Sequence, residues 1–355
     1  MRVPLGNAVP EMQRDMLGRA AHAYRLRWKR RRLLWRILRK RGEINALRNL
    51  TDRIRPDDIL LFCCVRNEAP RLPHFMQHYR VLGIRHFIFV DNGSDDGTTE
   101  YLCEQPDVSV WRTDQSYRLS RFGMDWLGWL QMRFGHGHWC LTVDADELLV
   151  YPQSESRDLH ALTAWLDTQG RQSFGALMID LYPKGGLQDR PFIAGTNPLE
   201  HLQWFDPTGY RLCQHPVFGN HWVQGGPRAR MFFKDDPERA PTLNKTPLVK
   251  WNRRFAYVSS THQILPARLH DVFDFAGQSL ASGALLHTKF LPQIAEKSQE
   301  ELIRQQHFQN ATSYADYHRQ LADNPILWHH GSQTYQDTES LIPHKLIVGS
   351  TWSTE

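Results

Sequence analysis

Short apolar runs alternate with segments of helical periodicity between residues 58 and 150, and this alternation constrains the fold more than any other feature of the chain. Residues 59–65 form a continuous apolar run, which is typical of a parallel strand buried on both faces. Residues 70–82 then repeat apolar side chains at helical spacing. The same order recurs, and we expect further strands over 85–90, 108–111 and 139–143 and further helices around 100–102 and over 124–134. The pattern predicts an α/β domain with a mostly parallel central sheet that is covered on both faces.

Polar clusters follow three of the predicted strands. They are Arg66-Asn67-Glu68, the segment Asp91-Asn92-Gly93-Ser94-Asp95-Asp96-Gly97-Thr98, and Asp144-Ala145-Asp146-Glu147. Ligands of parallel sheets bind at the carboxyl ends of the strands, and all three clusters open on that edge. We therefore expect a binding site there.

Asp144 and Asp146 are two residues apart after a buried strand, so an extended backbone points both carboxylates to the same side. Hard oxygen ligands of this kind suit Mg²⁺ or Mn²⁺, which substrate phosphates would also hold. Taken alone, such a pair is more typical of a solvated turn. Asp91 follows a buried strand, as acidic residues do at nucleotide sites, and it could hydrogen-bond a base N–H or a ribose hydroxyl. The segment around it also reads as a turn because of its Asn-Gly and Asp-Gly pairs.

In this order and at this spacing, the three clusters resemble the family 2-like glycosyltransferases with the GT-A fold, in particular the bacterial subgroup that carries a DADE-type metal motif. That family shows a strand end with Asn-Glu, a segment similar to DDGSTDGT, and a DxD motif. The resemblance is strong over residues 58–150 and looser over residues 175–320. It implies transfer of a sugar from a nucleotide-diphosphate donor, usually UDP-linked, with inversion at the anomeric carbon.

The resemblance also implies roles for individual residues. Asp91 matches the nucleoside-binding acid, and Asp144 and Asp146 match the pair that binds ribose, diphosphate and metal. His287 matches a histidine that often completes the metal shell in GT-A enzymes, with His262 as the alternative. Asn92 departs from the pattern because an aspartate is common there. In that family the catalytic base is usually an acidic residue of a Glu-Asp pair. This chain shows no clear pair of this kind, so the candidates for the base are Asp180, Asp206 and Glu200.

Four cations in the second half of the chain are candidates to bind a substrate diphosphate. Two of them follow a pair of glycines, and the other two lie in a later, mostly apolar segment. Each is singly more typical of a surface charge. With the strand-end clusters they complete the predicted nucleotide-sugar-binding set: Arg66, Asn67, Glu68, Asp91, Asn92, Ser94, Asp144, Arg228, Arg230, Lys245 and Lys250.

The positive charge of the chain is concentrated in its first 55 residues. They hold sixteen Lys/Arg and four Asp/Glu, which gives 16 − 4 = +12 and leaves +5 − 12 = −7 for the remainder. This balance argues against nucleic-acid binding by the body. Residues 13–41 predict one helix with Tyr24, Trp28 and Trp35 along one side and cations around them. Such a helix suits an anionic membrane surface. A helix that packs this stripe on the body is nearly as well supported, and RNA binding is a weaker option.

We expect a basic helical segment over residues 1–55, a GT-A domain over 56–295, and a C-terminal helical tail over 296–355 with a helix near 293–307. The chain has no apolar run long enough to span a membrane. Its five cysteines show no metal-binding spacing, which favours reduced thiols in the cytoplasm. Together with the basic helix and the missing span, this predicts a cytoplasmic enzyme on the inner face of a membrane.

The predicted function is metal-assisted transfer of a sugar from a UDP-linked donor to a glycan or lipid-linked acceptor. Two alternatives stay open: a sugar nucleotidyltransferase, and a catalytically degenerate module that binds a nucleotide or a sugar. The nucleotidyltransferase would normally have a glycine-rich basic loop after the first strand, and residues 66–70 contain no glycine. The sequence does not identify the donor sugar, the acceptor or the linkage.

Overall fold

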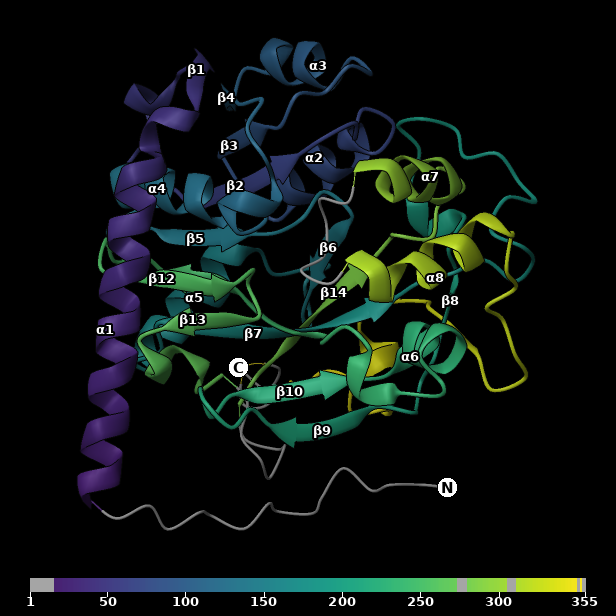
Figure 1. The fold of residues 1–355 in the computed structure, drawn as a ribbon. Helices are drawn as coiled ribbons and strands as arrows, with labels where there is room; N and C mark the ends of the chain where they lie inside the picture. Colours follow the sequence, from purple (N-terminus) through teal and green to yellow (C-terminus); the bar gives the residue numbers. More distant parts are fainter. Residues whose placement is uncertain (1–15, 273–279, 305–310, 350–351, 353–355) are drawn as a thin grey trace.

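A nine-stranded sheet forms the centre of the computed structural model, which describes residues 16–272, 280–304, 311–349 and 352 (Figure 1). Its strand order is β1-β4-β3-β2-β5-β11-β7-β14-β6. The strands are β1 (Asn45–Arg48), β2 (Leu60–Val65), β3 (His86–Asp91), β4 (Val108–Arg112), β5 (Trp139–Thr142), β6 (Glu147–Val150), β7 (Ser173–Asp180), β11 (Asn244–Lys250) and β14 (Gly283–His287). β2, β3, β4, β5, β7 and β14 run in one direction, and β1, β6 and β11 run in the other. The predicted α/β class with a mostly parallel sheet is confirmed.

Each face of the sheet carries its own hydrophobic core, because successive strand residues point to opposite faces. Leu61 and Cys63 of β2 lie in one core, and Leu60 and Phe62 lie in the other. The first core also contains the apolar sides of α2 (Leu72–Val81) and α5 (Leu159–Thr168). The second contains α4 (Met124–Phe134) and the hairpin of β12 (Ala256–Ser259) and β13 (Gln263–Leu265). Burial on both faces is the reason that the strands read as continuous apolar runs.

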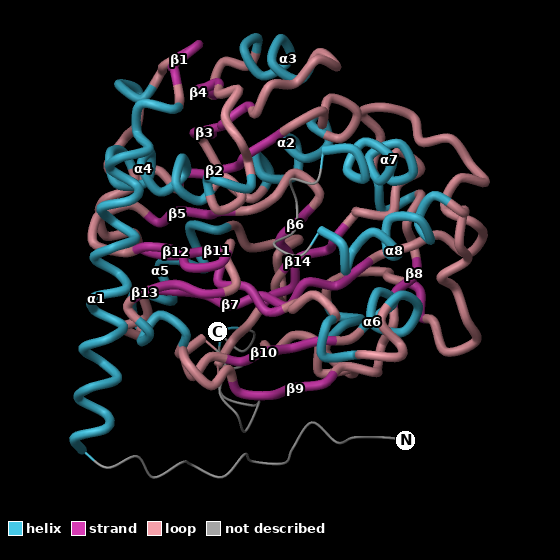
Figure 2. The backbone as a smooth tube through the Cα atoms, in the orientation of Figure 1, coloured by secondary structure: helices cyan, strands magenta, loops and turns pink. Residues whose placement is uncertain are grey.

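The second half of the chain adds smaller elements to this sheet (Figure 2). β9 (Arg211–Gln214) and β10 (His221–Gln224) form a hairpin, and β8 (Trp204–Phe205) pairs with β15 (Gln333–Thr334). The helices are α3 (Thr98–Glu104), α6 (Gly226–Phe232), α7 (Ile294–Arg304) and α8 (Ala311–Ala322). After α8 the chain is mostly irregular and returns to the body, where Trp352 is buried against Tyr151 and Trp165. In the described part of the predicted tail, the α-helices come first, a short 3₁₀ helix follows at Glu339–Leu341, and Trp352 packs on the domain.

The N-terminal helix α1 (Met16–Lys40) runs along one side of the molecule, on the left in Figure 1. It contacts α4 and β12, and Ile37 is buried at this contact. After α1, β1 adds a strand to the edge of the sheet beside β4, so the predicted segment 1–55 contributes to the central fold. Among the described residues, no helix combines the length and the apolar character that crossing a membrane requires.

The elements expected between residues 58 and 150 are all present, with ends shifted by one or two residues. α1 confirms the predicted helix over 13–41, of which residues 13–15 lie outside the described part of the chain. α7 confirms the helix near 293–307, of which residues 305–307 lie outside it. All five cysteines are free thiols, and Cys63 and Cys140 are buried.

Candidate functional site

The loops that follow β2 and β3 are joined by hydrogen bonds, which explains why both are polar. The amides of Asn67, Glu68 and Ala69 donate to side-chain oxygens of the second loop, at distances of 2.9–3.0 Å. The acceptors in that loop are Ser94, Thr98 and Asp96. In return, the Asn67 side chain accepts from the amide of Asp95 at 3.0 Å. Most of the two predicted polar clusters therefore serve to hold the carboxyl edge of the sheet in one conformation.

Asp91 and Asn92 lie beneath this pair of loops. The buried carboxylate of Asp91 accepts from the amide and hydroxyl of Ser94 and from the Thr99 hydroxyl at 2.9 Å. The side-chain Nδ2 of Asn92 donates to the backbone carbonyls of Thr113 and Gln115, at 3.2 and 2.9 Å. Arg66 donates to the carbonyls of Asn92 and Gly93. In the structure these side chains order the loop, and their contact with a nucleoside stays a prediction.

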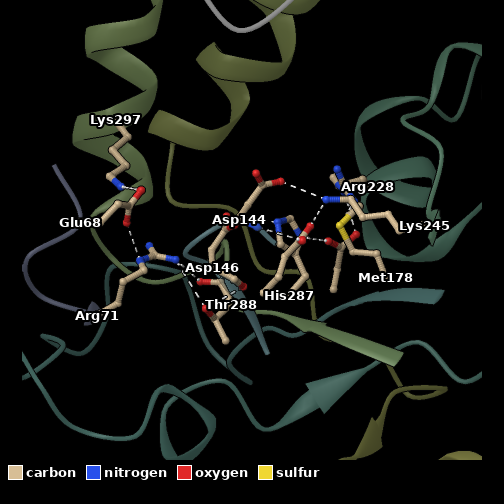
Figure 3. A network of polar contacts seen from close by, with 12 residues as sticks. Glu68, Arg71, Asp144, Asp146, Met178, Arg228, Lys245, His287, Thr288 and Lys297 are labelled. Atoms are coloured by element: carbon tan, nitrogen blue, oxygen red, sulfur yellow. Dashed lines mark hydrogen bonds and ion pairs between the residues drawn. The ribbon is translucent and has the colours of Figure 1, made fainter. Parts of the chain in front are cut away.

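A chain of charged groups connects the third cluster with β7 and β14 (Figure 3). His287, at the end of β14, lies between two carboxylates: its Nε2 is 3.1 Å from Asp146 Oδ2, and its Nδ1 is 2.6 Å from Asp180 Oδ1. Arg228, in the first turn of α6, donates to the other Asp180 oxygen at 2.7 Å. His287, Asp180 and Arg228 are all buried. The parallel pairing of β7 and β14 sets this geometry because it places His287 opposite Asp180.

The protonation of this chain follows from its neighbours. Burial alone would raise the pKa of Asp146, but the neighbouring His287, Arg71 and Lys289 outweigh it and hold that pKa well below its usual range. Burial would lower the pKa of His287, and the two carboxylates raise it instead. The pKa of Asp180 is lowered because Arg228 and His287 together outweigh its burial. Both carboxylates are therefore charged at neutral pH.

Asp144 and Glu147 share a cation, the ammonium of Lys245. Lys245 Nζ lies 3.0 Å from Asp144 Oδ2 and also forms an ion pair with the buried Glu147. Burial would lower the pKa of Lys245, but the two carboxylates raise it, so the ammonium stays charged. Burial raises the pKa of Glu147. Asp144 is half-exposed, so of the two it is the carboxylate that a ligand can reach.

A third group of contacts ties the first cluster to the end of β14 and to α7. Glu68 forms ion pairs with Arg71 at 2.8 Å and with Lys297 of α7 at 2.5 Å. Arg71 also donates to Thr288 at 3.4 Å, and the Thr288 amide donates to the Asp146 carbonyl at 2.7 Å. Glu68 thus fixes the wall of the site instead of standing free within it.

The donor atoms fit a divalent cation at Asp146 and His287. Asp146 Oδ2 and His287 Nε2 are in direct hydrogen-bond contact at 3.1 Å, and this separation is also close to that of neighbouring ligands around an octahedral ion with bonds of about 2.1 Å. Histidines that bind metals usually donate their other ring nitrogen to a carboxylate, as His287 can to Asp180. Within the described residues, no group of three or more His, Cys, Asp or Glu side chains is arranged to hold an ion. One or two side chains together with substrate phosphates are the ligand set that Mg²⁺ usually has.

The structure does not bring all the predicted cations to this site. Lys250 lies at the far end of β11, beside the start of β5, and forms an exposed ion pair with Asp167. A separation of five strand residues, about 17 Å, keeps it from the site that Lys245 reaches. Arg230 forms an ion pair with the buried Asp206 at 3.0 Å, outside the Asp180 chain. The position of Lys250 does not fit the predicted diphosphate contact, whereas the contact of Arg230 stays a prediction.

Neither first choice for the catalytic base has a free carboxylate in the structure. Asp180 is occupied by His287 and Arg228, and Asp206 is occupied by Arg230 and the Tyr182 hydroxyl. Nothing local in the sequence marks either side chain as paired, because the arginine that each one binds lies far away in the chain. Glu200 is exposed, on a short 3₁₀ turn. The base is unassigned.

His262 and Lys289 complete the surroundings. His262 is bound through Nδ1 to the Asn244 carbonyl at 2.8 Å, and burial together with Lys245 lowers its pKa to about 3, so it is neutral. Lys289 was not predicted, although it lies two residues after His287. It is half-buried beside Asp146, and burial lowers its pKa. Within the described part of the chain, its ammonium forms no recorded hydrogen bond or ion pair, so it is a better candidate for an anion contact than the paired Arg228.

Comparison with known proteins finds distant likenesses among solved structures. No protein-family model matches the chain. No curated protein matches it. A mannosyltransferase from Pyrobaculum calidifontis, in complex with GDP-mannose and Mn²⁺, is 18% identical with a TM-score of 0.28, and the match covers 44% of this chain and 47% of that one. A protein from Bacillus anthracis described as a glucose-1-phosphate thymidylyltransferase, in complex with a sucrose, is 8% identical with a TM-score of 0.25, over 81% of this chain and 93% of that one. Likenesses at this level carry no argument about activity.

Proposed function

We propose that the protein is a metal-dependent glycosyltransferase that takes a sugar from a nucleotide-diphosphate donor, UDP-linked, and transfers it with inversion to a glycan or lipid-linked acceptor. The observation that carries this proposal is the position of His287 between Asp146 and Asp180 at the carboxyl edge of the sheet. There, the partly buried carboxylate of Asp146 meets a histidine that has a second carboxylate behind it, at the sheet edge where nucleotides bind in α/β proteins.

In this proposal, Asp146 and His287 would hold Mg²⁺ or Mn²⁺ together with the phosphates of the donor, and the more exposed Asp144 would contact the ribose or the diphosphate. When bound, the ion neutralises the charge of the departing diphosphate. Asp180 holds the His287 ring in place by accepting from its Nδ1, so that Nε2 faces the site. Lys289, two residues after His287, would supply a cation for the diphosphate. Five free thiols support a reducing compartment, the cytoplasm, as the place of the reaction.

The nucleotidyltransferase alternative needs backbone amides that cradle a nucleoside triphosphate after the first strand. Here the amides of residues 67–69 are all bonded to side chains of the next loop. This favours the glycosyltransferase. The two activities also differ in product, because a nucleotidyltransferase joins a sugar phosphate to a nucleoside triphosphate and releases pyrophosphate from the latter.

Calorimetry with UDP and Mn²⁺ tests the proposal. We expect binding that depends on Mn²⁺ and that weakens by at least about 10- to 100-fold in Asp146→Asn, because loss of a mere outer-shell partner of a metal ligand already costs that much. Asp167→Asn is the matched control, because this exposed carboxylate pairs with Lys250 away from the site. A screen of nucleotide sugars for Mn²⁺-dependent donor hydrolysis then identifies the donor.

Three results would contradict the proposal in different ways. Equal binding of UDP in excess chelator would remove the metal from it. Binding without hydrolysis of any donor, and without transfer to any acceptor, would favour the degenerate binding module. Release of pyrophosphate from a nucleoside triphosphate and a sugar phosphate would favour the nucleotidyltransferase.

A further inference from the structure

α1 has two apolar stripes, and only one of them is used by the fold. The inner stripe contains Ile37, whose side chain is buried against Gly128 of α4. A Cβ at Gly128 would lie 2.8 Å from Ile37 Cδ1, so this glycine is what allows the two helices to approach so closely. An ion pair between Arg36 and the buried Asp125 at 2.7 Å fixes the same contact. The helix therefore docks on the body without its aromatic residues.

The outer stripe consists of three exposed aromatic side chains: Tyr24, Trp28 and Trp35 are 61%, 47% and 60% exposed. At about 100° per residue, these three positions fall within an arc of about 40°, roughly opposite Ile37. They extend over eleven residues, or about 17 Å along the helix. The stripe predicted from the sequence is thus real, but it faces away from the body. A helix that only packed on the body would present polar side chains there.

Cations surround the outer stripe without any acidic residue in the helix. Residues 16–40 contain ten Lys/Arg and no Asp/Glu. The guanidinium of Arg31 lies 5.5 Å from the Trp28 ring centre, and that of Arg39 lies 4.7 Å from the Trp35 ring centre. Each of these tryptophans therefore has a cation beside its ring.

The body adds positive charge next to the helix. Arg30 is close enough to Arg254 and Arg268 of the β12–β13 region for their charges to lower its pKa, after the larger effect of burial. Like charges gathered in this way repel one another. At about 100° per residue, however, Arg30 lies on the Ile37 side of α1, so this cluster faces the body and the proposal rests on the cations beside the outer stripe.

We propose that the outer face of α1 binds the surface of an anionic lipid bilayer, with Tyr24, Trp28 and Trp35 in the headgroup layer. Aromatic rings at the interface flanked by Lys and Arg are the composition of helices that lie in the plane of a membrane. The arginines contact lipid phosphates, and each contributes about fivefold to the binding constant. The straight, one-sided stripe suits a flat partner, which favours a bilayer over a nucleic acid.

Vesicle flotation of the full chain tests this proposal. We expect the protein to float with vesicles of mixed phosphatidylcholine and phosphatidylglycerol, and to stay behind with phosphatidylcholine alone. Trp28→Ser with Trp35→Ser should lower the partition coefficient by about tenfold or more, because both rings leave the interface. Arg31→Gln with Arg39→Gln should lower it by about 25-fold at low ionic strength, and added salt should weaken binding.

Val81→Ser with Ile193→Ser is the matched control, because both side chains are more than 70% exposed and neither lies on α1. This control should float like the unchanged protein. The tryptophan variant should keep the circular dichroism spectrum and the metal-dependent UDP binding of the unchanged protein, since its substitutions are on the surface. Equal flotation of the tryptophan variant would overturn the proposal. So would failure to bind anionic vesicles, including the case in which the chain binds single-stranded RNA instead.

Discussion

Lys245 and Lys250 lie on the same strand, β11, and replacing each by methionine compares a buried cation with an exposed one. The Lys245 side chain is 3% exposed and serves both Asp144 and the buried Glu147. The Lys250 side chain is 39% exposed and pairs with Asp167 on the surface. The substitution and the strand are identical, so a difference in stability reports the environment of the charge.

Lys245→Met leaves the Glu147 carboxylate buried without its cation. Removal of one partner of a buried ion pair costs about 3–5 kcal/mol, because the remaining charge has neither water nor a counterion. For the exposed Lys250→Met we expect a cost of about 0–1 kcal/mol. The first value is a large part of the total stability of a domain, which is about 5–15 kcal/mol.

The cost of Lys245→Met should depend on pH. Burial raises the pKa of Glu147 in the folded protein above its unfolded value, and loss of Lys245 raises it further. At pH values between the unfolded-state and the folded-state pKa of Glu147, the folded variant binds one proton more than the unfolded variant. Its free energy of unfolding therefore falls as pH rises through that interval. Lys245 in the unchanged protein is charged throughout, because the carboxylates raise its pKa. The deficit of the variant should therefore be small near pH 5 and large near pH 8.

Urea denaturation followed by circular dichroism at the two pH values measures both effects. Lys250→Met is the control at each pH, and its small cost should not change between them. A Lys245→Met cost that equals the Lys250→Met cost near pH 8 would refute the buried-pair reasoning. A large cost that is independent of pH would refute the assignment of the effect to Glu147.

Two further predictions concern the helix contact and the loop beneath the site. Gly128→Val should lower the free energy of unfolding by about 1–3 kcal/mol, because the added side chain overpacks against Ile37. Limited proteolysis should then cleave α1 faster than in the control variant Val81→Ser. Unchanged cleavage would mean that this contact does not hold the helix. Asp91→Asn should lower the free energy of unfolding, measured by urea denaturation, by about 1–3 kcal/mol. The reason is that an amide cannot accept from both Ser94 and Thr99 as the carboxylate does. A loss below about 0.5 kcal/mol would show that the loop does not depend on this charge.

The sequence was most informative where periodicity decides the structure. Continuous apolar runs predicted β2 and β3, because burial on both faces leaves no polar positions in these strands. The polar strand ends predicted the edge on which Asp146, Asp180 and His287 meet. These features depend on neighbouring residues in the chain.

The failures have the opposite origin, since they depend on contacts between distant residues. Lys245 meets Glu147 across 98 residues, and nothing local marks either side chain as paired. Lys250 looked equivalent to Lys245 because the sequence does not show where β11 begins and ends at the sheet edges. Asp180 looked free because its partner Arg228 is 48 residues away. For α1 the periodicity identified the aromatic stripe correctly. It could not show whether this stripe faces the body or the solvent, because that depends on what the helix packs against.

Alternate side chains of β2 belong to two different cores, so the number of residues in this strand is as restricted as their type. Deletion of one residue before Phe62 would send that side chain toward α2 and Cys63 toward α4, so both cores would lose their shape together. The same shift would move the amide of Asn67 away from Ser94. Changes in chain length among natural or designed variants should therefore avoid this strand and fall in exposed loops such as 188–197, where insertion leaves the sheet register intact.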